Sequence, residues 1–200
     1  GASPGTVIVD PEGSRPQIHV MCYGPDSFYE QTLTRVSEID EHIGKEPVTW
    51  IHIDGLGDIE ILQQLAERFG IHPLALEDVV NVHQRAKVDE YSNHLFIVGR
   101  MVTLESELRS EQVSIFLGPN YVLTFIEDPG DCFDPLRDRL KKGHGRHRQT
   151  GPDYLVYCLL DAIIDAYFPV LEEYGNRLDD LENQEIQTRN ASLISVIHSF

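Results

Sequence analysis

The stretch HPLALEDVVNVHQRAKVDEYSNHLFIV, residues 72–98, carries the strongest signal for the fold of this chain. Pro73 suits the first turn of a helix, and the helix expected at Pro73–Val80 carries two adjacent carboxylates, Glu77 and Asp78. A polar, basic turn follows, and then an apolar run typical of a buried strand. This order predicts an α/β unit whose chemistry is the binding of a hard cation by carboxylate oxygens, not catalysis.

Outward from this stretch, short β-type runs alternate with helical segments up to about Thr150. The Asp58–Phe69 segment repeats apolar residues on one helical face, and the turn Gly118-Pro119-Asn120 predicts an antiparallel hairpin. We therefore expect an α/β fold with a mixed parallel and antiparallel sheet covered by helices. The expected strands, rich in β-branched and aromatic residues, are Thr6–Val9, Gln17–Tyr23, Val48–Ile53, Leu95–Leu104, Gln112–Leu117 and Tyr121–Ile126.

The sequence changes character at Pro152, after which no β-type alternation occurs. Residues 152–187 predict one long helix, and Pro169 is the place where it could kink. Its first half is apolar on most faces, so we expect that half to be well buried. The second half, Leu171–Gln187, has six acids and one base, Arg177, so we expect it to be solvated or to face a cationic partner.

The chain thus divides into an α/β domain at residues 1–150 and a helical extension at residues 151–200. The last residues, LISVIHSF at 193–200, form an amphipathic helical pattern without a Gly or Pro stop. We expect this extension to hold the long helix and the cut start of a stalk helix that continues in a longer protein.

Composition narrows the classes of function. The chain has 33 acidic and 16 basic residues, a formal net charge of −17, which disfavours binding to nucleic-acid phosphates. Its three cysteines are isolated, which disfavours a disulfide framework and a structural zinc site. No apolar run approaches the length of a membrane span, and no signal peptide is visible at the start. We therefore expect a protein of a reducing compartment whose membrane segments, if any, lie outside these residues.

Two pairs of acids are candidate cation ligands. Glu77 and Asp78 point about 100° apart on a helix, so they are either solvent-exposed helix acids or ligands of two different or shared interface sites. Asp161 and Asp165 lie four residues apart in an otherwise apolar stretch. In a buried setting they would need a cation, or an ion pair with an Arg or Lys of the sheet. The residues alone leave both alternatives open.

Other motifs give weaker signals. No HExxH motif occurs among the nine histidines, so a catalytic zinc site is weakly supported. The basic segment 137–149 is either a solvated helix end or a patch for acidic segments or anionic lipid headgroups. Gly55 and Gly57 stand between a strand and a helix like a phosphate loop. The third glycine and the basic residue of such a loop are missing, and neighbouring aspartates would repel phosphate.

Five motifs in the same order as in a known family now identify the chain. It resembles the cytoplasmic domain of CorA-type magnesium/cobalt transport proteins over nearly its whole length. The resemblance implies an α/β/α sandwich fused to a long stalk helix, in a homopentameric membrane protein with regulatory Mg²⁺ between neighbouring cytoplasmic domains. The motifs are VTWIHIDGL (48–56), the stretch 72–98, EQVSIFLGPNYVLTFIE (111–127), FDPLRDRL (133–140) and DYLVYCLLDAIIDAYFPVLEE (153–173).

The resemblance also implies metal ligands. Asp78 matches the aspartate of the intersubunit site, while Glu77 and Asp161 match the carboxylates of a second site. The ion is expected to be Mg²⁺, or another divalent cation such as Co²⁺, in a regulatory role, and no catalytic residue is expected. Ala86 departs from the family pattern, which has Pro in this turn. The stalk aspartate that completes the intersubunit site, the pore helices and the Gly-Met-Asn motif are expected beyond Phe200.

The expected function is therefore that of a cytosolic Mg²⁺-sensing domain, on the cytoplasmic side of the inner or plasma membrane, of a Mg²⁺/Co²⁺ transport protein. One alternative is the same domain of a zinc transporter of the same superfamily. A second, from another class, is a soluble metal-dependent hydrolase that uses Asp54, Asp58 and a nearby histidine.

Overall fold

The computed structural model describes residues 7, 9–10, 12–104, 108–143 and 146–197, with side chains up to Asn183. A seven-stranded sheet forms its centre, in the order β2-β1-β3-β7-β6-β5-β4. The strands are β1 (Gln17–Tyr23), β2 (Phe28–Leu33), β3 (Val48–Asp54), β4 (Lys87–Glu90), β5 (Leu95–Leu104), β6 (Leu108–Leu117) and β7 (Tyr121–Ile126). The helices are the 3₁₀ helix η1 (Val36–Glu41) and the α-helices α1 (Ile59–Phe69), α2 (Pro73–Val80), α3 (Asp134–Lys142), α4 (Pro152–Asp165) and α5 (Tyr167–Ile197).

The sheet is mixed, as predicted. β3 and β7 pair in parallel, whereas the other neighbouring strands pair antiparallel. The turn at Gly118-Pro119-Asn120 joins β6 to β7 in the predicted hairpin. The parallel pair matters for the site, because it places the ends of β3 and β7 at the same edge of the sheet.

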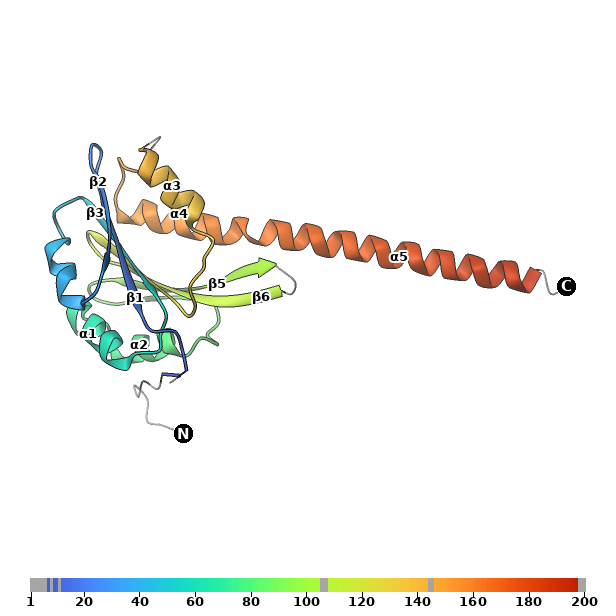
Figure 1. Ribbon diagram of the computed structural model, residues 1–200, viewed down its shortest axis with the longest axis horizontal. Helices are drawn as coiled ribbons and strands as arrows, with labels where there is room; N and C mark the ends of the chain where they lie inside the picture. Colours follow the sequence, from blue (N-terminus) through green and yellow to red (C-terminus); the bar gives the residue numbers. More distant parts are fainter. Residues whose placement is uncertain (1–6, 8, 11, 105–107, 144–145, 198–200) are drawn as a thin grey trace.

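Helices cover both faces of the sheet (Figure 1). Side chains alternate along each strand, so Val20 and Ile51 point to the core under α1 and α2, whereas Met21 and Trp50 point to the core under α3 and α4. The two cores lie on opposite faces of one sheet. The predicted α/β/α sandwich with a long C-terminal helix is therefore confirmed.

The long helix is interrupted between α4 and α5 at Ala166, three residues before Pro169. Pro169 lacks the N–H that would donate to the carbonyl of Asp165, and its ring crowds that carbonyl. This explains the interruption where a kink was expected. Beyond it, α5 projects away from the sheet (Figure 1). The division of the chain at residue 150 stays a prediction.

α4 was expected to be well buried, but only part of its apolar surface is. One stripe packs on the sheet through Leu155, Leu159 and Ile163, whereas Tyr157 and Ile164 are exposed. By length and composition the segment Pro152–Asn183 could cross a membrane. This differs from the expectation based on unbroken apolar runs, because an average over a window tolerates two aspartates. The core helix of a soluble domain has the same composition.

The two edge strands, β2 and β4, were not predicted from the sequence. β2 is mostly exposed, and β4 has the sequence KVDE, so neither forms an apolar run. Polar residues on edge strands prevent pairing with other chains, and they also hide such strands from pattern reading. β6 begins at Leu108, four residues earlier than expected. Of the strand expected at 6–9, Val7 and Val9 belong to no strand, and the other two residues lie outside the described part.

Candidate metal sites

Helix α2 presents Glu77 and Asp78. Its start is fixed by His72, whose Nδ1 accepts the N–H of Leu74 at 3.2 Å. One face of the helix is buried in the core through Ala75, Leu76 and Val79. The two carboxylates therefore lie at the margin of that face, half-buried and accessible to an ion from outside.

Two neighbouring strands hold Asp78, one through its carboxylate and one through its backbone carbonyl. Lys87 of β4 donates from Nζ to Asp78 Oδ2 at 2.7 Å and also lies 2.7 Å from Asp89. Burial disfavours the ammonium, but these two ion pairs outweigh it and raise the pKa of Lys87. The buried amide of Gln112 donates to the backbone carbonyl of Asp78 at 2.8 Å. Lys87 thus forms an ion pair with the carboxylate that the resemblance assigns to a metal.

Asp161 lies on α4 and is exposed, as is Asp165 one turn later. The expectation that these acids sit in a buried setting is wrong, because the helix buries only one stripe. Asp161 is on the layer opposite to Glu77 and Asp78, with the sheet between them. Within one chain the structure therefore does not bring the three predicted ligands together.

A different group of possible ligands converges at the C-terminal ends of the central strands β3 and β7. His52 is 2% exposed, and its Nε2 lies 2.6 Å from Asp54 Oδ1 and 3.1 Å from Asp131 Oδ2. Asp131 follows β7, and Arg137 of α3 binds both of its oxygens at 2.7 and 2.5 Å. Within the part of the chain that the structure describes, this is the one group of three His, Cys, Asp or Glu residues placed to hold a metal ion.

The charges in this group stabilise one another. Burial disfavours the imidazolium, but the contacts with Asp131 and Asp54 outweigh it and raise the pKa of His52. Burial also disfavours the charged form of both aspartates. Contacts with His19 and His52 nevertheless hold the pKa of Asp54 well below the usual range. Contacts with His52 and Arg137 do the same for the pKa of Asp131. The two carboxylates therefore favour a positive charge at His52 Nε2.

The comparisons with known proteins follow this geometry. The family model described as "CorA-like Mg2+ transporter protein" matches residues 45–199. The chain belongs to this CorA family. The CorA resemblance drawn from the motifs is confirmed.

Relatives and a solved structure agree with the CorA family. The chain is 39% identical to the cobalt/magnesium transport protein CorA of Thermotoga maritima over 99% of the chain and 58% of that protein. It is 30% identical to the putative metal ion transporter YfjQ of Bacillus subtilis over 78% of the chain and 49% of that protein. The chain thus spans about half the length of these relatives. Both are named as transporters, which agrees with a role other than catalysis.

The fold matches the soluble domain of CorA from Methanocaldococcus jannaschii. The TM-score is 0.64 at 19% identity, over 84% of this chain and 64% of the other. At this identity the likeness shows the fold alone. Both groups of acids therefore stand on the same kind of sandwich as in that soluble domain.

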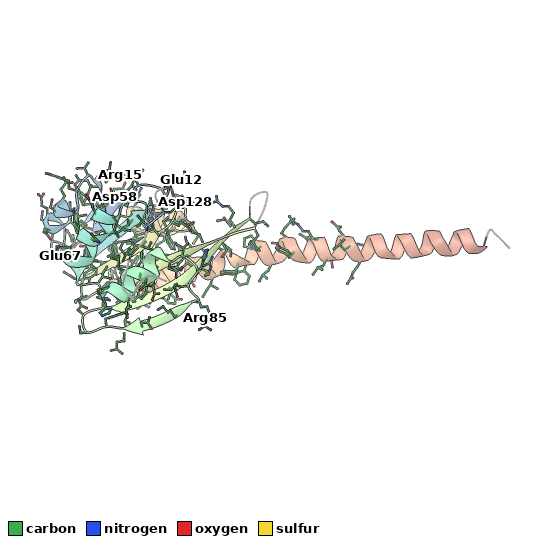
Figure 2. All side chains as sticks on the ribbon, turned by 90° about the horizontal axis from the view of Figure 1, so that it is seen from below. Glu12, Arg15, Asp58, Glu67, Arg85 and Asp128 are labelled. Carbon is green, nitrogen blue, oxygen red and sulfur yellow. The ribbon has the colours of Figure 1, made fainter. Side chains whose placement is uncertain are left out.

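The structure does not bring Asp54 and Asp58, the two acids named for a hydrolase, to one site. Asp54 joins His52, but Asp58 caps α1 by accepting the N–H groups of Glu60 and Ile61. Figure 2 shows Asp58 beside Arg15, and their side chains lie 3.6 Å apart. The carboxylate of Asp58 is thus committed to the helix start. The hydrolase alternative named Asp54 with Asp58 and a nearby histidine but missed Asp131. The parallel pairing of β3 with β7 brings Asp131 to Asp54.

Proposed function

We propose that this chain is the cytosolic, regulatory Mg²⁺-sensing domain of a divalent-cation channel or transporter of the CorA family. The transported ion is Mg²⁺ or Co²⁺, and the membrane is the inner or plasma membrane, with this domain on its cytoplasmic side. In this proposal the longer protein is a homopentamer and reaches the membrane through segments outside this chain.

One observation carries the proposal: the predicted ligands lie on opposite layers of the same sandwich. Glu77 and Asp78 stand on α2, and Asp161 stands exposed on α4. If one domain turns its α2 layer to the α4 layer of its neighbour, Glu77 and Asp161 meet across an interface, with Asp78 beside them. A closed ring of such head-to-tail contacts is the arrangement a cyclic oligomer requires.

The proposed mechanism is electrostatic. With a formal charge of −17 for each chain, neighbouring domains repel one another unless cations lie between their acidic faces. Mg²⁺ bound by one or two carboxylates and several waters bridges the faces and stabilises a closed ring. When internal Mg²⁺ falls, repulsion loosens the ring and the pore opens. Binding mainly through water implies weak affinity, which suits feedback on free Mg²⁺ in the cell.

The first experiment replaces Asp78 and Asp161 with alanine in the intact transport protein. We expect Mg²⁺ to protect the wild-type protein from limited proteolysis and the double variant much less, because two carboxylates of the bridges are gone. Glu67→Ala is the matched control, since Glu67 is an exposed acid on α1 (Figure 2). Unchanged protection in the double variant would show that these carboxylates do not sense Mg²⁺. Flux measured with Zn²⁺ against Mg²⁺ separates the zinc-transporter alternative.

The ion pair of Lys87 with Asp78 makes a second prediction. Lys87→Gln removes a positive charge that competes with the cation, so Mg²⁺ should bind more tightly in the intact protein. A repulsion of roughly 2 kcal/mol between Mg²⁺ and an ammonium group at about 4–5 Å in a water-like dielectric corresponds to an affinity about 20-fold higher. The Mg²⁺ concentration at half-maximal protection from proteolysis measures it. Lys142→Gln, at an exposed lysine on α3, is the control. An unchanged or higher midpoint for Lys87→Gln would contradict the role given to Asp78.

A further inference from the structure

We propose that His52, Asp54 and Asp131, with His19 at the rim, form a separate site for a borderline divalent metal ion such as Zn²⁺ or Co²⁺. The site lies at the edge of the sheet, between β1, β3, the segment after β7 and the start of α3. It shares no residue with the proposed Mg²⁺ half-sites at Glu77, Asp78 and Asp161, and it does not depend on the proposed function.

The ligand atoms are already gathered. One atom from each of the three residues lies within 4.8 Å of the others. His52 Nε2 and Asp54 Oδ1 are both buried, yet neither makes a well-aligned hydrogen bond with any described residue, although they lie 2.6 Å apart. Ligand atoms around a tetrahedral Zn²⁺ are about 3.3 Å apart, given bonds of about 2.0–2.1 Å. An outward movement of Asp54 by less than an ångström would therefore make room for the ion.

The ring of His52 is oriented from behind, as in many metal sites. Trp50 Nε1 can only donate, and it lies 3.0 Å from Thr124 Oγ1. The Thr124 hydroxyl in turn faces the carbonyl of Ile51 at 3.5 Å and His52 Nδ1 at 2.6 Å. With the hydroxyl hydrogen directed at Ile51, His52 Nδ1 donates to Thr124. When the ring is neutral, its lone pair is therefore on Nε2, which points at the two carboxylates. Either a proton or a metal ion can occupy this position, and the two compete for it.

The charge of the pocket suits a divalent ion. A pocket of about 340 Å³ opens here and is lined by His19, His52, Asp54, Asp131, Asp134 and Arg137, among others. Three carboxylates against one guanidinium leave two negative charges when both histidines are neutral. His19 lies at the opening, with Nδ1 3.0 Å from Thr32 Oγ1 and Nε2 3.2 Å from Asp54 Oδ2. His19 therefore borders the site through Asp54 and is not one of the three gathered ligands.

The donor set selects the metal. Imidazole nitrogen suits Zn²⁺, Co²⁺ and similar ions, whereas Mg²⁺ prefers oxygen ligands and retains its waters. An imidazole nitrogen beside two carboxylates therefore favours the borderline metals over Mg²⁺.

The test is a titration of the 200-residue chain with Co²⁺, followed by its visible absorption. We expect one Co²⁺ for each chain, with the intense absorption of a site of fewer than six ligands. One equivalent of Zn²⁺ should remove this absorption, and a large excess of Mg²⁺ should not. His52→Gln and Asp54→Asn should each weaken Co²⁺ binding about tenfold or more. Asp54→Asn is the second variant because Asp54 lies at the margin of the core, where a substitution disturbs folding less than at buried His52. Circular dichroism checks that both variants are folded.

Matched controls are Asp78→Asn and Asp161→Asn, which remove carboxylates of the proposed Mg²⁺ half-sites and should leave the Co²⁺ absorption unchanged. The proposal is overturned if the folded wild-type chain shows no such absorption, or if both site variants keep it. It is also overturned if Mg²⁺ displaces Co²⁺ readily or if the control variants abolish binding. Failure of Mg²⁺ sensing in the intact protein would leave these results unaffected, so the two proposals fail separately.

Discussion

Trp50→Ala is expected to lower the free energy of unfolding by about 3–5 kcal/mol, the range for deleting a large buried aromatic side chain. Trp50 is fully buried at the centre of the core under α3 and α4. Its ring meets Phe133 edge-on at 6.0 Å, and the guanidinium of Arg137 lies 5.3 Å from its centre. The variant leaves a cavity and also removes the partner of the Thr124 hydroxyl. Urea denaturation followed by circular dichroism measures the loss.

Two control variants separate packing from hydrogen bonding. Trp50→Phe keeps much of the apolar volume but loses the indole N–H, so its cost should be about half as large. Tyr157→Ala removes an aromatic ring that is 58% exposed on α4 and should change stability by about 0.5 kcal/mol or less. A cost for Trp50→Ala as small as that for Tyr157→Ala would mean that this face of the sheet is not a packed core.

The strands of the core could be predicted from the sequence because each is rich in apolar, β-branched and aromatic residues. β1, β5 and β7 begin and end where this pattern predicts, and β3 is longer by one residue, Asp54. Burial on both faces makes such runs, since every side chain meets a helix layer or a neighbouring strand. The polar edge strands, β2 and β4, carry no comparable signal.

The candidate site at His52 could not be predicted, because it depends on which strands are neighbours. His52 and Asp54 share one face of β3, and that alternation is visible in the sequence. Asp131 comes to them only through the parallel pairing of β3 with β7. The assignment of Glu77, Asp78 and Asp161 rests on the family resemblance and stays a prediction. What the structure adds is that they lie on opposite layers, which no helical periodicity reveals.

Gly55→Ala is expected to cost about 2–6 kcal/mol of folding free energy, because two penalties combine at one position. Gly55 has φ +100°, a conformation that costs a residue with a side chain about 1–3 kcal/mol. An added Cβ would also stand 2.5 Å from the carbonyl oxygen of Ser14 and 2.9 Å from that of Arg15. Overlap with backbone costs about 1–3 kcal/mol more, since backbone cannot rotate away as a side chain can. Chemical denaturation measures the total.

Gly130→Ala separates the cost of the backbone conformation from the cost of the overlap. Gly130 has φ +116°, similar to Gly55, but an added Cβ there would meet nothing within 4 Å. Its cost should therefore be that of the conformation alone, and the difference between the two variants should report the overlap with Ser14 and Arg15. Equal costs would mean that the segment before β1 moves aside freely. A difference of about 1–3 kcal/mol would show why glycine stands at this turn: the chain's own backbone fills the space in which a phosphate loop would hold its ligand.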